Sequence, residues 1–206
     1  MATKEINQYY DATASRQPRV DLAFAVSLIP KSERNVNVAI DCGCGAGADI
    51  AYLRQHGFSV YGYDVEAEAI ARCTQRFRND VEVSLTQASF NSFSYPTASI
   101  VYADASLFFC PKSDFDEAVT KIKGCLVVGG IFAASFLGHR DTMATSDYDQ
   151  DVFWSDVLTT DETALKAKFA DYEMMKFTEH ESDGLTVQGQ PHHWHIFSMV
   201  MRKVNH

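Results

Sequence analysis

Apolar residues recur along the chain with two different spacings, and the alternation of these spacings predicts an α/β fold. Segments such as residues 67–77 and 115–125 place apolar side chains at helical intervals. Between such segments lie short apolar runs typical of strands, and the run at residues 131–137 is apolar throughout, as in a strand buried on both faces. On this pattern we expect strands at residues 38–41, 58–63, 81–85, 99–103, 131–137, 172–181 and 195–202.

The connections between these segments indicate how the sheet is closed. The last two expected strands are joined without a helix, through a glycine-containing connection at residues 183–191, and strands joined in this way pair antiparallel. Gly129 and Gly130 are expected to form a turn after the helix at residues 115–125. Thr159 and Glu162 have the spacing of a capping box that begins a helix running to about residue 169. The pattern therefore predicts a mixed sheet that ends in an antiparallel pair.

A candidate ligand site lies at residues 38–47, where an apolar strand leads through Asp41 into a glycine-rich loop. Glycines let the backbone turn sharply beside a ligand, and the following helix directs its free N–H groups at that ligand. Two cofactors suit this unit, a dinucleotide and S-adenosylmethionine, and the spacing of Gly43, Gly45 and Ala48 leaves both open. A carboxylate at Asp41 would repel a pyrophosphate and suits the ammonium group of a methionine moiety.

Asp64 supports an adenosine ligand of either kind. It ends the second expected strand, roughly 20 positions beyond the glycines, where an acidic residue holds both ribose hydroxyls. This chemistry is common to both cofactors, so Asp64 does not distinguish them.

At these residues the sequence resembles the class I methyltransferases, whose first motif, Asp-x-Gly-x-Gly-x-Gly, is matched by Asp41, Gly43, Gly45 and Gly47. It is most similar to small bacterial methyltransferases of the tellurite-resistance type, through residues 104–109, 136–141 and 194–197. The resemblance implies a doubly wound, mostly parallel, seven-stranded sheet with an antiparallel closing strand. It also implies that S-adenosyl-L-methionine is the cofactor and S-adenosyl-L-homocysteine the product.

The resemblance further implies where the cofactor is contacted. Residues 87–90 fall where the family places its adenine contacts, but the Asp that many members carry there is missing, and the chain offers Gln87 and Ser89. Phe90 is a candidate to pack on the purine. The expected cofactor contacts are Asp41, Gly43, Gly45, Gly47, Asp64, Val65, Ser89, Phe90, Ala103 and Asp104.

Methyl transfer from a sulfonium requires positioning above all, so a dedicated base is optional. His139 and His193 are the candidate catalytic bases, since histidine titrates near working pH. A metal site at the histidines of residues 192–195 is not expected, because no carboxylate or thiol lies beside them in the sequence. The expected acceptor contacts are Tyr10, Arg16, Phe108, Arg140 and His193.

Composition limits the remaining possibilities. A chain of 206 residues, 46% hydrophobic and 22% charged, suits a single domain at residues 1–206, with residues 1–30 as an N-terminal helical cap. A net charge of −9 and scattered basic residues argue against nucleic acid as a partner. No apolar run approaches membrane-spanning length, and five cysteines in which no paired spacing is repeated suit a cytoplasmic protein.

We therefore expect a methyltransferase that acts as a monomer or homodimer on a small-molecule acceptor. A thiol and a chalcogen oxyanion are the candidate acceptors, because both arrive ready to attack. An NAD(P)-dependent oxidoreductase and a non-catalytic module that binds an adenosine cofactor stay open as alternatives.

Overall fold

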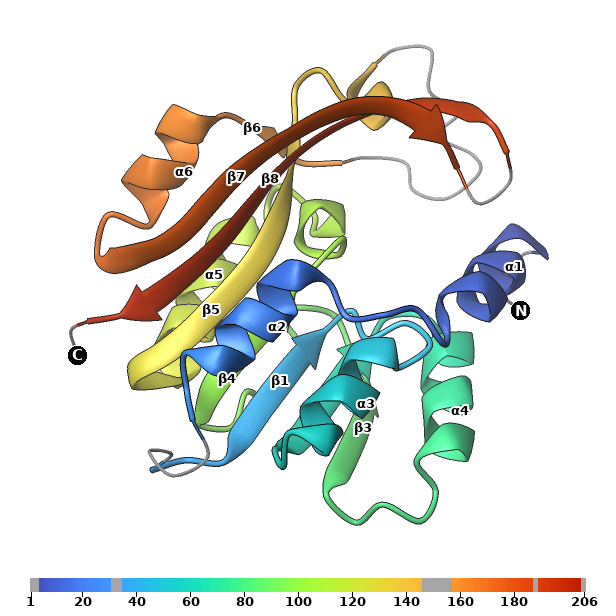
Figure 1. The fold of residues 1–206 in the computed structure, drawn as a ribbon, viewed down its shortest axis with the longest axis vertical. Coiled ribbons are helices and arrows are strands. Elements are labelled where there is room, and N and C mark those ends of the chain that lie inside the picture. Colours follow the sequence, from blue (N-terminus) through green and yellow to red (C-terminus); the bar gives the residue numbers. More distant parts are fainter. Residues whose placement is uncertain (1–3, 31–34, 146–156, 187–188, 205–206) are drawn as a thin grey trace.

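The computed structural model describes residues 4–30, 35–145, 157–186 and 189–204, and within this part of the chain eight strands form one sheet (Figure 1). The strands follow the order β3-β2-β1-β4-β5-β8-β7, and the short strand β6 pairs with β5. Their bounds are β1 Val38–Cys42, β2 Ser59–Asp64, β3 Val83–Gln87, β4 Ala98–Ala103, β5 Leu126–Gly138, β6 Thr159–Thr160, β7 Tyr172–Leu185 and β8 Pro191–Lys203.

Strand direction agrees with the sequence expectation of a mostly parallel sheet. Strands β3, β2, β1, β4 and β5 pair in parallel. Strand β8 runs antiparallel to both β5 and β7. The doubly wound sheet with an antiparallel strand near its edge is thus confirmed. The described residues form eight strands where seven were expected, and the additional strand is the two-residue β6.

Helices cover both faces of the sheet and enclose two hydrophobic cores (Figure 1). In helix α2, Leu22, Ala25 and Val26 are buried at positions i, i+3 and i+4, so a single apolar stripe packs on β5 and β8. The opposite core gathers Ile122, Phe132 and Phe169. The helices are α1 Lys4–Thr13, α2 Val20–Ser27, α3 Ala48–Gln55, α4 Ala67–Arg76, α5 Phe115–Cys125 and α6 Glu162–Lys168.

Two local expectations are wrong. Gly129 and Gly130 do not form a turn before a strand, because β5 begins at Leu126 and absorbs them as an irregularity in its pairing with β4. Thr159 does not cap α6, because it pairs with Leu137 in the short strand β6. Asp161 is the cap instead, and its side chain accepts a hydrogen bond from the Ala164 N–H at 2.8 Å.

The expected N-terminal cap consists of two helices in different places, and residues 1–3 of it lie outside the described residues. Helix α1 lies beside the carboxyl end of the sheet, where Tyr10 packs with Ala46 and Ala69, whereas α2 packs on the sheet face (Figure 1). Among the described residues, none of the helices has the length and apolar character needed to cross a membrane.

Candidate active site

The strand order reverses between β1 and β4, and a crevice at the carboxyl ends of the strands is expected at such a point. Asp41 lies in β1 opposite Tyr102 of β4, and Asp104 follows β4 directly. The distal part of the β7–β8 hairpin extends past these strand ends toward α1 (Figure 1). Three segments far apart in the sequence therefore surround one edge of the sheet.

The glycine loop is packed so closely at Gly43 and Gly47 that a side chain at either position would overlap its neighbours. Gly43 has φ +75°, and a Cβ atom there would lie 2.5 Å from the Cβ atom of Ser106. Gly47 has φ +78°, and its Cβ would lie 2.9 Å from the Cys73 sulfur. The Ser106 hydroxyl also donates to the Cys42 carbonyl oxygen at 2.7 Å. The loop is therefore fixed against the segment that follows β4.

Asp64 stands at the end of β2 and is tied to the glycine loop. Its Oδ2 atom accepts a hydrogen bond from the Gly45 N–H at 2.9 Å, and its Oδ1 atom accepts one from the Glu66 N–H at 3.0 Å. Burial raises the pKa of Asp64, and the hydrogen bonds from the backbone act in the opposite direction. Each oxygen retains acceptor capacity for a ligand hydroxyl.

Asp41 is buried at the centre of the site, with 2% of its surface exposed. Its Oδ2 atom, Oδ1 of Asp49 and the hydroxyl of Tyr102 have no hydrogen-bond partner within the described part of the chain. Burial, followed by the charge of Asp49, raises the pKa of Asp41 well above its usual range. Buried acceptors of this kind require a donor, so this part of the sheet edge is suited to a cationic ligand group.

Two arginines of residues 14–19, which we call the N-terminal strap, reach into the same region. Arg16 forms an ion pair with Asp49, and Arg19 forms one with Asp104. Tyr10, also expected at the site, lies over the glycine loop, with its ring 3.7 Å from the place of a Cβ atom on Gly45. The strap therefore connects α1 and α2 across the carboxyl ends of β1 and β4.

The residues expected around adenine lie at the ends of β2 and β3. Val65 is 42% exposed, and its carbonyl oxygen accepts a hydrogen bond from Gln87 at 3.0 Å. Ser89 bonds with Ser92, while the half-buried Phe90 contacts Tyr63 edge to face. Phe90 is thus partly held by packing and retains a surface for a ligand.

The segment after β4 holds an uncommon backbone conformation. Ala103 is fully buried in the strand, so only its main chain can face a ligand. Ala105 has φ +47°, a region that L-residues rarely adopt, and its N–H donates to the Ser135 hydroxyl at 2.7 Å. Phe108 is buried, and its carbonyl oxygen accepts a hydrogen bond from the Leu158 N–H at 2.8 Å. These contacts fix the direction in which Asp104 leaves the strand.

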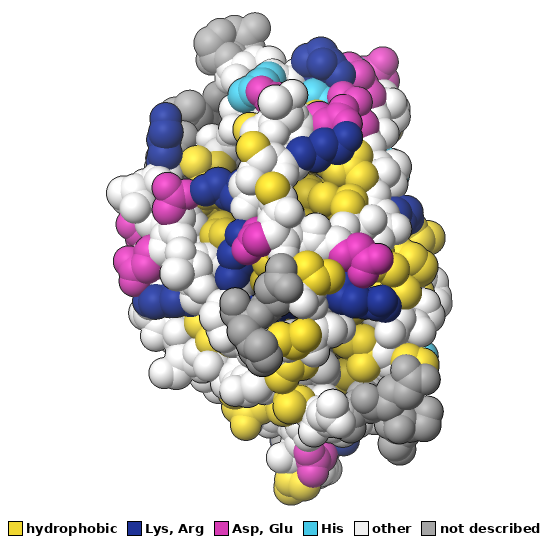
Figure 2. Space-filling view, turned by 90° about the vertical axis from the view of Figure 1, so that its left-hand side faces the viewer, with side chains coloured by type: hydrophobic (Ala, Val, Ile, Leu, Met, Phe, Trp, Pro, Cys, Tyr) yellow, Lys and Arg dark blue, Asp and Glu magenta, His cyan; other side chains and the backbone are white. Residues whose placement is uncertain are grey.

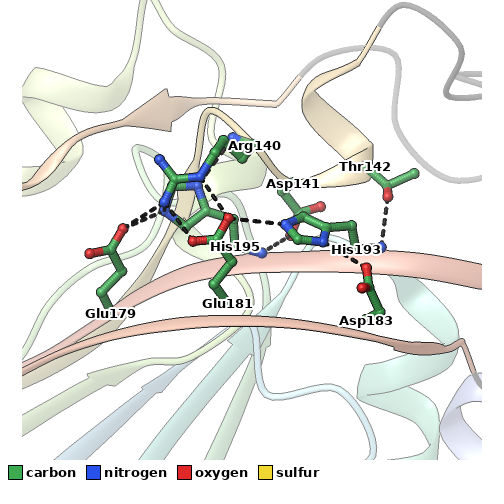
Figure 3. A network of polar contacts seen from close by, with 8 residues as sticks. All are labelled: Arg140, Asp141, Thr142, Glu179, Glu181, Asp183, His193 and His195. Atoms are coloured by element: carbon green, nitrogen blue, oxygen red, sulfur yellow. Dashed lines mark hydrogen bonds and ion pairs between the residues drawn. The ribbon is translucent and has the colours of Figure 1, made fainter.

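Arg140 and His193, two of the expected acceptor contacts, belong to a polar network between the β7–β8 hairpin and the segment after β5 (Figure 3). Arg140 donates to Glu181 through Nε at 2.7 Å and to Glu179 through Nη2 at 3.0 Å. His193 lies 2.8 Å from Asp183 and 3.3 Å from Glu181, and these hydrogen bonds raise its pKa. The carboxylates therefore favour the protonated, cationic form of His193.

His139, the second candidate base, contacts β6 instead of the hairpin network. Its Nδ1 atom lies 2.9 Å from the Thr159 hydroxyl. Within the described part of the chain, neither candidate base forms a hydrogen bond with Asp41, Asp64 or Asp104.

The side chains of Glu179, Glu181 and His195 offer ligand atoms within 4.8 Å of one another. However, Nδ1 of His195 accepts a hydrogen bond from the Arg140 N–H at 3.1 Å, so the ring proton belongs on Nε2, which donates to Glu179 at 2.9 Å. A metal ion would need the Nε2 lone pair, and the Arg140 guanidinium already supplies the positive charge. The arrangement is that of an internal ion network.

Three buried residues of this region were missed by sequence reasoning. Asp49 and Tyr102 carry orphan polar atoms beside Asp41. Asp141 is fully buried, and its carboxylate accepts hydrogen bonds from the His195 N–H and from the His192 ring, both at 2.9 Å. Acidic residues in the first turn of a helix are usually exposed, so the sequence pattern does not mark Asp49 as a site residue. The signal that could have identified Asp49 is its position directly after the glycines.

Comparison with known proteins agrees with this geometry. Residues 39–130 match a family model described as a methyltransferase domain. No curated protein sequence matches the chain at a significant level. The solved structure of TehB from Haemophilus influenzae shares 18% identity at a TM-score of 0.73, over 95% of this chain and 65% of TehB, so the chain spans less than two thirds of that protein.

Two further structures extend the likeness over nearly their whole length. N-methyltransferase NodS from Bradyrhizobium japonicum, in complex with S-adenosylhomocysteine, shares 15% identity at a TM-score of 0.62, over 97% of this chain and 99% of NodS. A 1,6-didemethyltoxoflavin-N1-methyltransferase from Burkholderia thailandensis, with its substrate and S-adenosylhomocysteine bound, shares 14% identity at a TM-score of 0.63, over 100% and 92% of the two chains.

Proposed function

Because residues 39–130 carry a methyltransferase domain and the chain has the class I methyltransferase fold, we propose that it is an S-adenosylmethionine-dependent methyltransferase acting on a small-molecule acceptor. The observation that carries this proposal is the set of buried, unpartnered acceptors on Asp41, Asp49 and Tyr102 beside the glycine loop. The ammonium group of a methionine moiety supplies three N–H donors to such acceptors.

The other residues of the edge suit the rest of the cofactor. The carboxylate of Asp64 is held by the glycine loop and can accept the hydroxyls of a ribose. Phe90 and Val65 offer apolar surface to an adenine. Arg16, which already carries a carboxylate partner in Asp49, suits the carboxylate of the methionine moiety. A dinucleotide would instead bring a pyrophosphate next to the buried Asp41.

When bound, S-adenosylmethionine supplies an electrophilic methyl group, and the protein has to position the acceptor and exclude water. Oriented reactants can lower the barrier by about 7–11 kcal/mol, so the site does not need a base. Asp183 and Glu181 favour the protonated form of His193, which suits binding a negative acceptor better than removing a proton. Acceptors that arrive as nucleophiles, such as thiolates and chalcogen oxyanions, fit this chemistry.

A small acceptor is also supported by surface charge. The net charge of −9 opposes binding of a polyanion. On the face seen in Figure 2, basic side chains are interspersed with acidic ones. On α6, which belongs to this side of the molecule, Lys166 pairs with Glu162 and Lys168 pairs with Asp116.

Calorimetry with S-adenosylhomocysteine tests the cofactor assignment. Asp64→Ala should weaken binding by about 1.5–3 kcal/mol, because it removes hydrogen bonds to a charged acceptor. Asp171→Ala is the matched control, since it removes a carboxylate before β7, at the opposite edge of the sheet, and should leave affinity unchanged. Unchanged affinity in Asp64→Ala, or tighter binding of NAD than of S-adenosylhomocysteine by the wild type, would contradict the proposal.

Turnover tests the acceptor class. Release of S-adenosylhomocysteine should occur with a member of a panel of thiols and selenium or tellurium oxyanions. Small amines, carboxylates and RNA complete the panel. Turnover with RNA alone would refute the small-molecule acceptor, and binding without any turnover would favour the non-catalytic module.

A further inference from the structure

Negative charge exceeds positive charge at the buried edge of β1 and β4. Three carboxylates, Asp41, Asp49 and Asp104, which we call the carboxylate trio, face the two guanidinium groups of Arg16 and Arg19. With all five side chains ionised, the site carries one negative charge more than positive charges. Asp41 and Asp49 are 2% and 7% exposed, so solvent screens this excess poorly.

Burial raises the pKa values of Asp41 and Asp49, so the surroundings of the trio disfavour its ionised form, which a cationic ligand would favour. The pKa of Asp49 is raised by burial even though Arg16 acts to lower it. The hydroxyl of Tyr102, which is 2% exposed, points to no acceptor or donor among the described residues, and burial and the charge of Asp104 raise its pKa. The protein therefore holds, at the same place, unpartnered polar atoms and carboxylates whose ionised form needs an additional cation.

The proposed donor and product differ by one unit of charge. S-adenosylmethionine combines a zwitterionic amino-acid end with a positive sulfonium. In methyl transfer the acceptor's electron pair forms the new bond to carbon, and the pair of the broken S–C bond stays on sulfur, which becomes neutral. The donor therefore offsets one unit of the excess negative charge of the site, and the product does not.

We propose that the carboxylate trio makes this site selective for the cationic methyl donor over its neutral product, and that Asp104 is the residue that sets this selectivity. The proposal rests on the proposed function. Asp41 and Asp49 flank the glycine loop, at the end suited to the ammonium group. Asp104 begins the segment after β4, and its partner Arg19 is the more exposed of the two strap arginines, with 56% of its side chain in solvent against 27% for Arg16.

The test compares the binding of three ligands of similar shape that differ in charge at the reacting centre. S-adenosylmethionine and sinefungin, a stable analogue with an amine in place of the sulfonium, are cationic at the reacting centre, whereas S-adenosylhomocysteine is neutral there. Calorimetry on the wild type should give both cationic ligands a Kd about tenfold lower than that of S-adenosylhomocysteine, as expected for one additional charge interaction in a partly screened site.

Two variants should move this ratio in opposite directions. Asp104→Asn should reduce the preference to about twofold or less, since it removes the excess charge and so weakens the two cationic ligands more than S-adenosylhomocysteine. Arg19→Gln should increase the preference severalfold, since it removes the cation that partly neutralises Asp104. A purely structural role would change the affinities of all three ligands together.

The failures of the two proposals are distinguishable. If the wild type binds none of the three ligands, the proposed function itself is wrong. If the wild type binds all three with equal affinity, or if both variants leave the ratio unchanged, the methyltransferase assignment stands and the charge selection is refuted. The wild-type ratio decides the question even if Asp104→Asn does not fold.

Discussion

At the residue scale, the carboxylate of Asp41 is removed from water by folding, and its Oδ2 atom receives no hydrogen bond from the described residues. A buried carboxylate without a donor destabilises a folded protein unless it is protonated, which is why the pKa of Asp41 is raised. A bound ammonium would favour the ionised form. Asp41 therefore lowers the stability of the free protein and strengthens binding of a ligand that carries an ammonium group.

Asp41→Asn should stabilise the free protein at pH 7 by about 1–3 kcal/mol, because the amide keeps the shape of the side chain without the charge that burial penalises. Because the pKa of Asp41 is higher in the folded than in the unfolded state, wild-type stability falls as the pH rises through the folded pKa, and the variant lacks this loss. Below about pH 4, where Asp41 is protonated in both states, the difference should disappear.

Urea unfolding at pH 7 and at pH 3.5 measures the difference, and calorimetry should show weaker S-adenosylmethionine binding by the same variant. Asp171→Asn removes a half-exposed carboxylate and serves as the control for a general charge effect. Equal stability of Asp41→Asn and wild type at both pH values would show that the burial of Asp41 has no energetic consequence.

Single residues of the site were predictable from the sequence where they lie next to a recognisable strand end. Asp41 is the last residue but one of β1 and Asp64 is the last residue of β2, so their place at the sheet edge followed from the apolar pattern before them. Asp49 and Tyr102 lie inside a helix and a strand, where no turn residue marks them, and their role depends on burial that only the assembled fold creates. The ordinary pKa of histidine makes His193 a candidate base. The carboxylates that raise its pKa, Asp183 and Glu181, are 10 and 12 positions away in the sequence, so this shift was not predictable.

At the element scale, the glycine loop depends on contacts from α4 and from the segment after β4. Gly43 packs on Ser106, and Gly47 packs on Cys73 and Phe77. The loop conformation is therefore a property of three elements together. Changes in this loop should affect folding as well as ligand binding.

Gly43→Ala should destabilise the protein by about 2–4 kcal/mol, because the new Cβ both overlaps Ser106 and imposes a left-handed conformation on an L-residue. Gly124→Ala is the control, since this residue lies in α5 with no atom within 4 Å of a new Cβ. It should stabilise the protein by up to about 1 kcal/mol through helix propensity. Urea unfolding of both variants measures these effects, and a neutral Gly43→Ala would mean that the loop is loosely packed.

Helices were predicted better than the ends of strands. Helix α5 has the expected bounds, since its apolar spacing covers three turns. The errors at Gly129 and Thr159 arose because pairing with a distant strand overrode local turn and capping preferences. Such pairing is a tertiary interaction that local sequence does not encode.

At the scale of the whole molecule, the matched methyltransferase segment at residues 39–130 contains the glycine loop, Asp64 and Asp104, whereas the β7–β8 hairpin lies outside it. The general architecture was predictable because strand and helix patterns alternate. The ion network of Arg140 and the hairpin was not, because it joins three segments whose charges look solvent-exposed in the sequence.

Cofactor binding should stabilise the complete fold by mass action. S-adenosylhomocysteine at 100 times its Kd should add about 2.7 kcal/mol and raise the Tm by about 5–10 °C. Differential scanning fluorimetry measures the shift, and Asp64→Ala at the same ligand concentration should shift less. A comparable shift with NAD, or none with either compound, would argue against the assignment.

The position of β8 in the sheet bears on how the protein is made. Strand β8 follows β7 in the chain but lies between β5 and β7, with seven residues paired to β5. Until residues 191–203 have left the ribosome, β5 lacks its neighbour on that side, although its central residues Ile131, Phe132 and Ala133 are fully buried in the finished sheet. An unpaired apolar strand edge promotes aggregation. The nascent chain should therefore depend most on chaperones during the interval between synthesis of β5 and synthesis of β8.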